Sequence, residues 1–338
     1  MKAPLASRFI GLGALLVLLF FVSFGVGRYA LSPRTVAAVL LARLTLSPAG
    51  VSPETEVVVW AIRLPRILAA ILVGSALSVS GAAYQGLFRN PMVSPGILGV
   101  SAGASLGAAV AILVGLGMGG VQGLAFVGGL SAVGLTWVVS ALVGGRSEPV
   151  LLTVLTGTII SALFGAFLSM VKLVADPTNA LPSITYWLMG SLASVGAKEV
   201  LVASPLVLGG VGLLLALAPS LNVLCFGDEE ARSLGVEPGR FRIAVILGAT
   251  LVTAAAVAIS GVIGLVGLIV PHLARMLVGP DHRRLLPASA LLGGAFLLAV
   301  DDLARSLFAV EVPLGILTSI VGAPFFLWLL RRGPRRWA

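Results

Sequence analysis

Residues 90–145 read NPMVSPGILGVSAGASLGAAVAILVGLGMGGVQGLAFVGGLSAVGLTWVVSALVGG, with no charged residue among them. A helix that crosses a membrane needs about 20 predominantly apolar residues, so this stretch is too long for one crossing and suits two. The glycine-rich segment 115–120 supplies a turn between them. We therefore predict two membrane helices in this stretch, near 96–116 and 121–143.

The composition extends this prediction to the whole chain of 338 residues. Hydrophobic residues make up 58% of it and charged residues only 10%, whereas soluble domains are roughly 25% charged. So few charges cannot cover a water-soluble body of this size, which excludes a soluble single-domain enzyme. The chain has enough apolar residues for on the order of ten crossings. The uncharged stretches place them near 9–30, 62–84, 96–116, 121–143, 149–171, 192–217, 241–260, 264–279, 285–308 and 313–330.

This pattern predicts an all-α fold, a polytopic membrane protein with those ten transmembrane helices. The prolines within 177–189 favour a short helix at the membrane surface there. An even number of spans places both termini on one side, and that side receives more of the 22 Lys and Arg residues, including the tail RRGPRRWA. The positive-inside rule therefore predicts cytoplasmic termini, and the net charge of +9 reflects topology rather than nucleic-acid binding.

The two halves of the chain each hold an odd number of predicted spans. If the halves are related, they lie in opposite orientations, which is common in transporters. Ser80-Gly81 in the first half matches Ser260-Gly261 in the second, at the same separation as Pro91 and Pro271. We therefore predict a single domain, 1–338, with an inverted pseudo-repeat of two helix sets, 9–171 and 192–330.

Small residues recur on the helix predicted at 96–116. Gly99, Gly103 and Gly107 are spaced by four residues, which gives one nearly flat helix face. Flat faces allow a neighbouring backbone to approach closely, as in the small-residue motifs of membrane helices. We interpret this spacing as packing rather than chemistry.

Two enzyme motifs were weighed against the sequence. The segment GVSAG at 99–103 formally matches the nucleophile elbow of serine hydrolases, but that elbow needs a strand before its helix. The serine would also need a histidine as its base, and the chain offers only His272 and His282. A phosphate-binding P-loop needs Lys followed by Ser or Thr after a glycine-rich turn. The three lysines instead stand in the pairs Lys2-Ala3, Lys172-Leu173 and Lys198-Glu199. Transport driven by ATP would therefore need a separate ATPase subunit.

Asp301 and Asp302 are adjacent acids inside a predicted span, and Arg305 follows one turn later. Charges inside a bilayer are costly and are often functional, so proton coupling is one interpretation. The other is ion pairing with Arg305 across one helical turn, or with basic residues of an adjacent loop. We favour ion pairing and keep a proton-coupled secondary transporter as the alternative function.

The polar segment 222–242 is the largest cytoplasmic loop in this topology. Its acids Asp228, Glu229 and Glu230 open a short helix, and small residues follow them. Such a helix could seat in a groove of another protein. An ordinary capped surface helix explains the same pattern, so the residues alone leave both interpretations open.

Four stretches carry a resemblance to a known family. They read IRLPRILAAILVGSALSVSGAAYQGLFRNPMVSPGILGVSAGASLGA (62–108), FGDEEARSLGV (226–236), GVIGLVGLIVPHLARMLVGPDHRRLLP (261–287) and VPLGILTSIVGAPFFLWLL (312–330). In this order, the chain resembles the FecCD-type permease subunits of ABC importers for ferric siderophores, haem and cobalamin, which are type II importers. The resemblance covers nearly the whole chain.

The resemblance implies a ten-helix permease in the inner (plasma) membrane of a bacterium, working by alternating access. The implied partners are a second copy of the chain in a homodimer with the path on its axis, two cytoplasmic ABC ATPase subunits, and a periplasmic or extracellular substrate-binding protein. The implied cofactor is ATP-Mg on the ATPase, with none in this chain. Ferric siderophore is the first expected cargo, and haem, cobalamin and oxyanions such as molybdate stay open.

Three groups of site residues follow from the resemblance by position. The coupling helix that meets the ATPase is Gly227, Asp228, Glu229, Glu230, Ala231, Arg232, Ser233, Leu234 and Gly235. The outward basic residues that receive acidic side chains of the binding protein are Arg63, Arg66 and Arg305. The cytoplasmic gate is Asn90, Pro91, Met92, Ser147 and Glu148.

Overall fold

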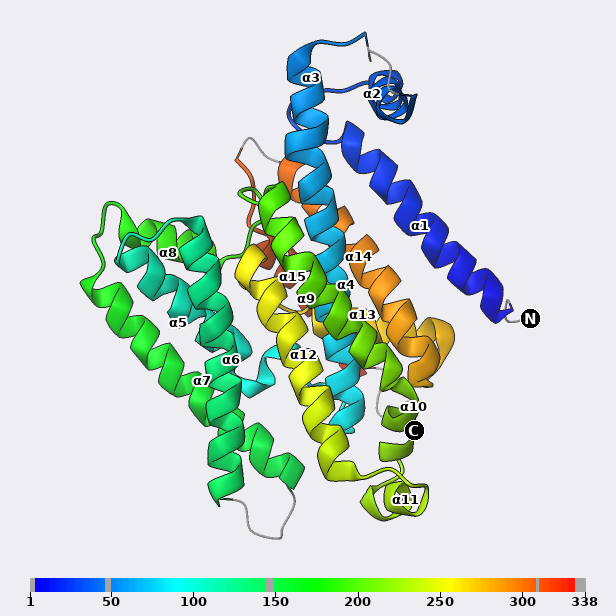
Figure 1. Ribbon diagram of the computed structural model, residues 1–338, viewed down its shortest axis with the longest axis vertical. Coiled ribbons are helices and arrows are strands. Elements are labelled where there is room, and N and C mark those ends of the chain that lie inside the picture. The colour runs from blue at the N-terminus through cyan, green and yellow to red at the C-terminus, as the bar shows by residue number, and fades with distance from the viewer. Residues whose placement is uncertain (1–3, 46–49, 144–148, 308–309, 332–338) are drawn as a thin grey trace.

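The computed structural model describes residues 4–45, 50–143, 149–307 and 310–331. All regular secondary structure in these ranges is helical, which confirms the predicted all-α class. Seven helices are long and apolar enough to cross a membrane, and three shorter apolar helices accompany them. The chain therefore folds as a polytopic membrane bundle (Figure 1).

Each of the ten predicted spans corresponds to a helix. The helices are α1 (Leu5–Gly25), α4 (Leu64–Leu87), α5 (Val100–Leu113), α6 (Met118–Val143), α7 (Pro149–Val174), α9 (Ala197–Ala216), α12 (Pro238–Ser260), α13 (Val266–Val278), α14 (His282–Ser306) and α15 (Leu314–Arg331). The second span begins earlier than expected, because α3 (Pro53–Val57) and the π-helix η1 (Val58–Arg63) continue directly into α4.

Short helices connect the spans. They are α2 (Pro33–Thr45), the 3-10 helix η2 (Pro95–Leu98), α8 (Ala180–Leu188), α10 (Ala218–Leu224) and α11 (Asp228–Ser233). The helix expected within 177–189 is confirmed as α8, whereas α2 was missed. The signal for α2 was present, since Ser32 Oγ accepts the Thr35 N–H at 3.1 Å and Pro33 occupies the first helical position.

The bundle has two ends, which lie at the top and bottom of Figure 1. The upper end carries α2 and α3 and is called the α3 end. The lower end carries α11 and is called the α11 end. Between them α4 packs against α9, α12, α13 and α14, while α5, α6, α7 and α8 form a group at one side.

Glycines allow two of the closest helix contacts. A Cβ atom on Gly81 of α4 would lie 1.9 Å from the Gly267 carbonyl oxygen of α13, and one on Gly103 of α5 would lie 2.1 Å from the Gly128 carbonyl oxygen of α6. The flat face predicted from the glycine spacing is therefore confirmed for Gly103. Gly99 plays another part, because it precedes α5 as its N-cap with φ 94°.

The nucleophile elbow is not formed. The GVSAG segment lies at the start of α5 and is preceded by η2 and not by a strand. Ser101 is a residue of the first turn of a membrane helix, as the sequence context indicated. The serine-hydrolase interpretation therefore has no structural support.

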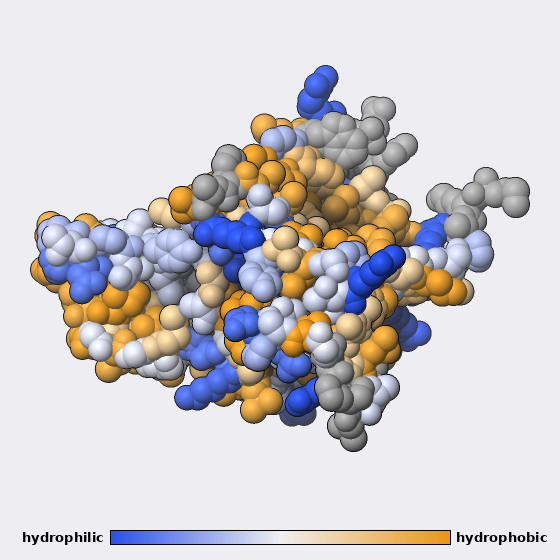
Figure 2. Space-filling model, turned by 90° about the horizontal axis from the view of Figure 1, so that it is seen from above, coloured by the Kyte–Doolittle hydropathy of each residue, from blue (hydrophilic) through white to orange (hydrophobic). Residues whose placement is uncertain are grey.

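The sides of the bundle expose large apolar residues. On α7 they include Ile159, Met170 and Leu173, all exposed. Soluble monomers rarely show so large an apolar surface, so this face is covered by lipid or by another protein chain. Seen from the α3 end, hydrophilic side chains gather in patches among hydrophobic ones (Figure 2).

Candidate functional site

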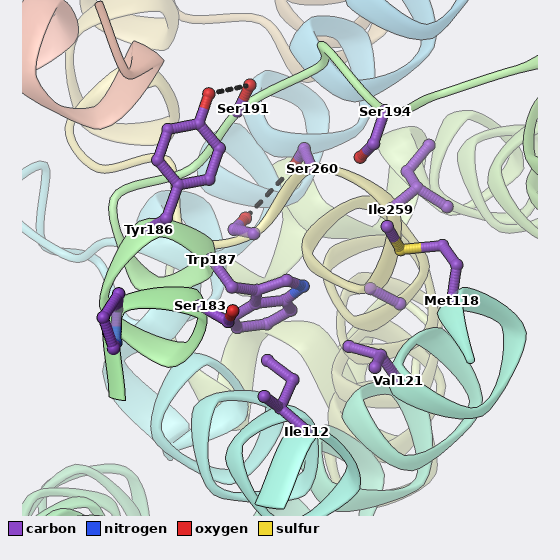
Figure 3. Close-up of a pocket in the computed structure, with 13 residues that line it drawn as sticks. Ile112, Met118, Val121, Ser183, Tyr186, Trp187, Ser191, Ser194, Ile259 and Ser260 are labelled. Atoms are coloured by element: carbon purple, nitrogen blue, oxygen red, sulfur yellow. Dashed lines mark hydrogen bonds between the residues drawn. The ribbon is translucent and has the colours of Figure 1, made fainter. Parts of the chain in front are cut away.

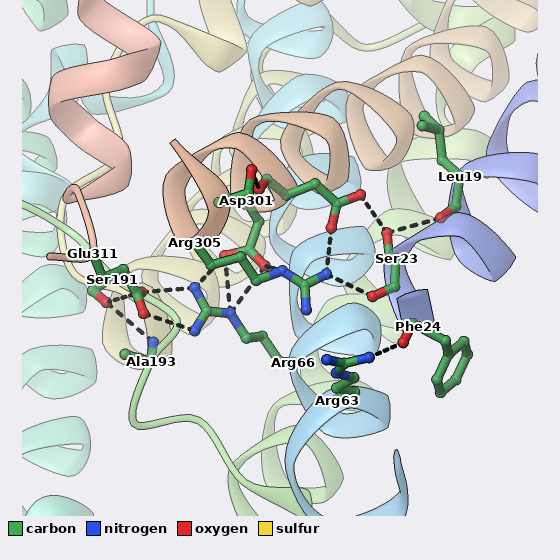
Figure 4. Close-up of polar contacts among 12 residues, drawn as sticks. Leu19, Ser23, Phe24, Arg63, Arg66, Ser191, Ala193, Asp301, Arg305 and Glu311 are labelled. Carbon is green, nitrogen blue, oxygen red and sulfur yellow. Dashed lines mark hydrogen bonds and ion pairs between the residues drawn. The ribbon is translucent and has the colours of Figure 1, made fainter. Parts of the chain in front are cut away.

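A buried cluster of charges lies near the α3 end, where α1, α4 and α14 meet (Figure 4). At its centre Asp301 of α14 is fully buried. The Arg66 guanidinium of α4 donates to it from Nε at 2.9 Å and from Nη2 at 2.7 Å. Arg305 Nε lies 3.6 Å from Asp301 Oδ2, one turn along the same helix. Asp301 is thus held by arginines from two helices.

Asp302 joins α1 to the same cluster. It forms an ion pair with Arg305 and accepts a hydrogen bond from Ser23 Oγ of α1 at 2.7 Å. Arg305 Nη2 also donates to the Ser23 carbonyl oxygen at 2.9 Å. Ion pairing, the favoured interpretation of the two aspartates, is therefore confirmed.

Glu311 completes the cluster from the segment between α14 and α15. Arg66 Nη1 donates to it at 3.1 Å and Nη2 at 2.7 Å, and its side chain keeps 22% of its exposure. Ser191 Oγ lies 3.5 Å from the same carboxylate. Sequence reasoning missed Glu311, because nothing in the sequence indicates that it meets an arginine so far away in the chain.

The three arginines predicted to receive the binding protein are buried in this chain. Arg63, Arg66 and Arg305 are only 4%, 8% and 7% exposed, and Arg63 donates to the backbone carbonyls of Phe24 and Tyr29. Charged groups inside a helical bundle need partners, because an unpaired buried charge is strongly destabilising. The arginines therefore hold helix ends together, and three carboxylates balance their charge.

A pocket of about 490 Å³ opens beside this cluster (Figure 3). The ends of α5, α6, α8 and α12 surround it, with Met118, Tyr186 and Trp187 among the lining side chains. Ser191 also lines it and receives the Tyr186 hydroxyl at 3.4 Å, while its N–H donates to the Ser260 carbonyl at 2.8 Å. Ser191 thus belongs both to the pocket wall and to the charge cluster.

The predicted coupling helix forms at the α11 end. It is α11, which starts after Gly227 at φ 126° and ends before Gly235 at φ 79°. Ala231 is fully buried and anchors the helix, whereas its other predicted residues are exposed or half-buried. Asp228 pairs with Arg242 of α12 at 2.6 Å. The short helix is therefore attached to the first turns of a spanning helix.

The predicted gate residues 90–92 lie in the turn that follows α4. Asn90 Oδ1 accepts the Met92 N–H at 2.9 Å, which shapes this turn. A pocket of about 540 Å³ separates the turn from α11, lined by Asn90 and Met92 on one side and by Gly227 and Asp228 on the other. The structure thus brings part of the predicted gate and the predicted coupling helix together. Ser147 and Glu148 lie outside the described residues.

Hydrogen bonds inside the bundle link the helices behind these two elements. Tyr84 of α4 bonds Thr250 of α12 at 3.1 Å, and Thr253 of α12 donates to Ser80 of α4 at 3.0 Å. All four side chains are buried, where such bonds are not exchanged with water. The helix α12, which follows α11, and the helix α4, which leads into the turn at residues 90–92, are therefore joined.

One known protein family matches nearly the whole chain. The FecCD transport family matches residues 15–332 of this chain. The chain belongs to the FecCD transport family. This confirms the resemblance seen in the sequence, and the protein is a multi-pass membrane permease of that family.

Named relatives of this FecCD permease span its full length. The molybdate import system permease protein MolB of Haemophilus influenzae is 40% identical and covers 96% of both chains. The cobalamin import system permease protein BtuC of Halobacterium salinarum is 42% identical over 94% of both. A solved structure of a metal-chelate type ABC transporter in an inward-facing conformation is 39% identical, with a TM-score of 0.85, and covers 96% of this chain and 98% of that one.

Proposed function

We propose that this FecCD permease is the membrane subunit of an ATP-driven importer, in which two copies form a homodimer and pass substrate along its axis by alternating access. The observation that carries the proposal is the arrangement at the α11 end. There a short helix tied to α12 faces the turn after α4 across one pocket. A partner that moves α11 would therefore act directly beside the gate turn.

The proposed partner at α11 is an ABC ATPase that binds ATP-Mg. Beside the exposed acids of α11 stand two exposed apolar side chains, Phe226 and Leu234, which are 73% and 65% exposed. Apolar anchors rimmed by charges are typical of a helix that docks into a groove of another protein. The chain itself has no P-loop, so hydrolysis belongs to that partner.

The proposed partner at the α3 end is a substrate-binding protein, which docks on the charge cluster of Arg63, Arg66 and Arg305. We place the permease in the plasma membrane of a bacterium, with the α3 end outside. The α11 end and both termini are then cytoplasmic. The excess of basic residues on that side supports the orientation. The pocket lined by Tyr186 and Trp187 lies at the same end and suits the entrance of the path.

The proposed cargo is a metal chelate, with ferric siderophore first. Among the relatives, the permease for cobalamin, a cobalt chelate, supports this class, whereas the permease for molybdate carries an oxyanion. Because the relatives differ in cargo, haem, cobalamin and oxyanions stay as alternatives. In this arrangement the binding protein selects the cargo, so the permease needs no chelating residues of its own.

Reconstitution tests the proposed function. The permease is placed in vesicles with its ATPase and binding protein, and uptake of a ferric siderophore, cobalamin and molybdate is measured with ATP inside. We expect uptake of one class that stops when ATP is replaced by a non-hydrolysable analogue. Uptake that persists without hydrolysis and collapses with a proton uncoupler would instead support the alternative, a secondary transporter that uses Asp301 and Asp302.

A further inference from the structure

The Arg66 guanidinium is shared by two carboxylates of unequal exposure. Asp301 is fully buried and holds Nε and Nη2. The Glu311 carboxylate accepts hydrogen bonds from Nη1 and also from Nη2, and its side chain is 22% exposed. The N–H groups that a carboxylate from outside the protein can reach are therefore those that Glu311 now occupies.

The cluster around Arg66 carries no net charge. Its three arginines, Arg63, Arg66 and Arg305, are matched in number by three acids, of which Glu311 is the most exposed, and Arg63 itself donates to backbone carbonyls. An acidic partner gains little attraction from a neutral cluster, and the Glu311 carboxylate repels it at close range. Glu311 thus opposes the contact that the arginines would otherwise offer.

We propose that Glu311 is an internal competitor, which occupies the place on Arg66 that an acidic side chain of the substrate-binding protein takes when it docks. This inference rests on the proposed function, in which the α3 end receives that protein. Docking then exchanges one carboxylate for another at Nη1 and Nη2, while Asp301 keeps the guanidinium oriented. The exchange leaves the buried charge paired, which avoids the large cost of an uncompensated arginine.

Ser191 connects this exchange to the pocket at the α3 end. Its hydroxyl reaches Glu311 at 3.5 Å and receives the Tyr186 hydroxyl at 3.4 Å, and both Ser191 and Tyr186 line the pocket. The backbone supports the same link, because the Leu314 N–H donates to the Gly190 carbonyl at 2.8 Å. Displacement of Glu311 therefore acts on hydrogen bonds that end in the pocket wall.

The test compares Glu311→Gln with a matched control, Glu56→Gln. Glu56 is exposed on α3 at the same end of the bundle, so its substitution removes the same charge without touching Arg66. The affinity of the substrate-binding protein of the same importer is measured on the permease–ATPase complex in nanodiscs without ATP. We expect Glu311→Gln to lower Kd about tenfold, as for one close charge contact, and Glu56→Gln to leave it within about twofold.

Unchanged or weaker binding by Glu311→Gln, with wild-type binding intact, overturns the inference and leaves the proposed function standing. Wild-type complex that binds no substrate-binding protein contradicts the proposed function and the inference with it. Glu311→Asp keeps the charge but shortens the reach to Arg66, so a smaller gain in affinity is expected. It supplies the same comparison if Glu311→Gln lowers the yield of folded protein, and no gain from it would count against Glu311 as competitor.

Discussion

At the scale of single residues, Asp301 links two helices near the α3 end through its ion pairs. Its carboxylate is fully buried and meets arginines from α4 and α14. A buried ion pair adds little net stability by itself, but removing one partner leaves a charge that water cannot reach. Asp301 therefore matters for folding more than for transport chemistry.

Substitution Asp301→Asn tests this role. We expect the free energy of unfolding to fall by about 3 kcal/mol, because Arg66 and Arg305 each lose a charged partner in a buried site. The measurement is denaturant or thermal unfolding in detergent. Asp176→Asn, at an exposed site whose side chain bonds only Thr178, serves as control and should change stability by less than about 0.5 kcal/mol. An equal loss of unfolding free energy in both variants would show that Asp301 does not stabilise the buried cluster.

Only part of this cluster was predictable from the sequence. The pairing of Asp301 and Asp302 with Arg305 follows from helical spacing, because residues three and four apart share one helix face. The meeting of Glu311 with Arg66 does not, since it depends on how α4 and the segment before α15 come together in space. For the same reason the sequence did not show that Arg63, Arg66 and Arg305 are buried.

At the scale of elements, α11 is joined to α12, and α12 is joined to α4, which leads into the predicted gate at residues 90–92. The Asp228–Arg242 pair joins the first two helices, and buried hydroxyls at Tyr84 and Thr250 join the last two. Both members of the ion pair keep some exposure, so its contribution to stability is about 1 kcal/mol or less. Its value is geometric, because it fixes α11 relative to a spanning helix.

Exchanging the two charges tests this link. We expect Asp228→Arg alone to lower ATP-driven uptake several-fold while leaving the melting temperature nearly unchanged, because two positive charges then push α11 away from α12. The double variant Asp228→Arg with Arg242→Asp restores the pair and should restore most of the uptake. Uptake and ATPase rate are measured together in vesicles. Failure of the double variant to improve on the single one would show that the pair does not transmit the movement.

The elements themselves were largely predictable, and the errors have physical causes. Apolar stretches with few charges marked every predicted span, because lipid admits few charges over the length of a crossing. The start of the second span was missed by several residues, since the polar residues of α3 continue into it as helix. The helix α2 was not predicted, although Ser32 and Pro33 form a standard helix start.

At the scale of the whole molecule, Cys225 is a natural reporter of orientation. It is the one cysteine of the chain and is exposed at the α11 end, between α10 and α11. Partial burial of this side chain nevertheless raises the pKa of its thiol, and the charges of Arg275 and Arg89 offset this only in part. Less thiolate is therefore present near pH 7, and labelling speeds up as the pH rises.

A membrane-impermeant maleimide applied at pH 8.5 tests the proposed topology. We expect Cys225 to be labelled in inside-out vesicles and protected in right-side-out vesicles, because the α11 end is proposed to be cytoplasmic. The control is Arg34→Cys in a Cys225→Ser background, which places a thiol on exposed α2 at the α3 end and should give the reverse pattern. Labelling of Cys225 from the outer side would overturn the orientation.

The sequence alone determined the class of the protein, the positions of its ten spans and the family to which it belongs. These features depend on composition and on the local sequence, because the length of a membrane crossing and the geometry of a helix constrain consecutive residues. The tertiary structure alone decided which charges are buried, that Glu311 shares Arg66 with Asp301, and that the gate turn faces α11 across a pocket. Such contacts join residues far apart in the chain, and only the packing of the helices brings them within reach.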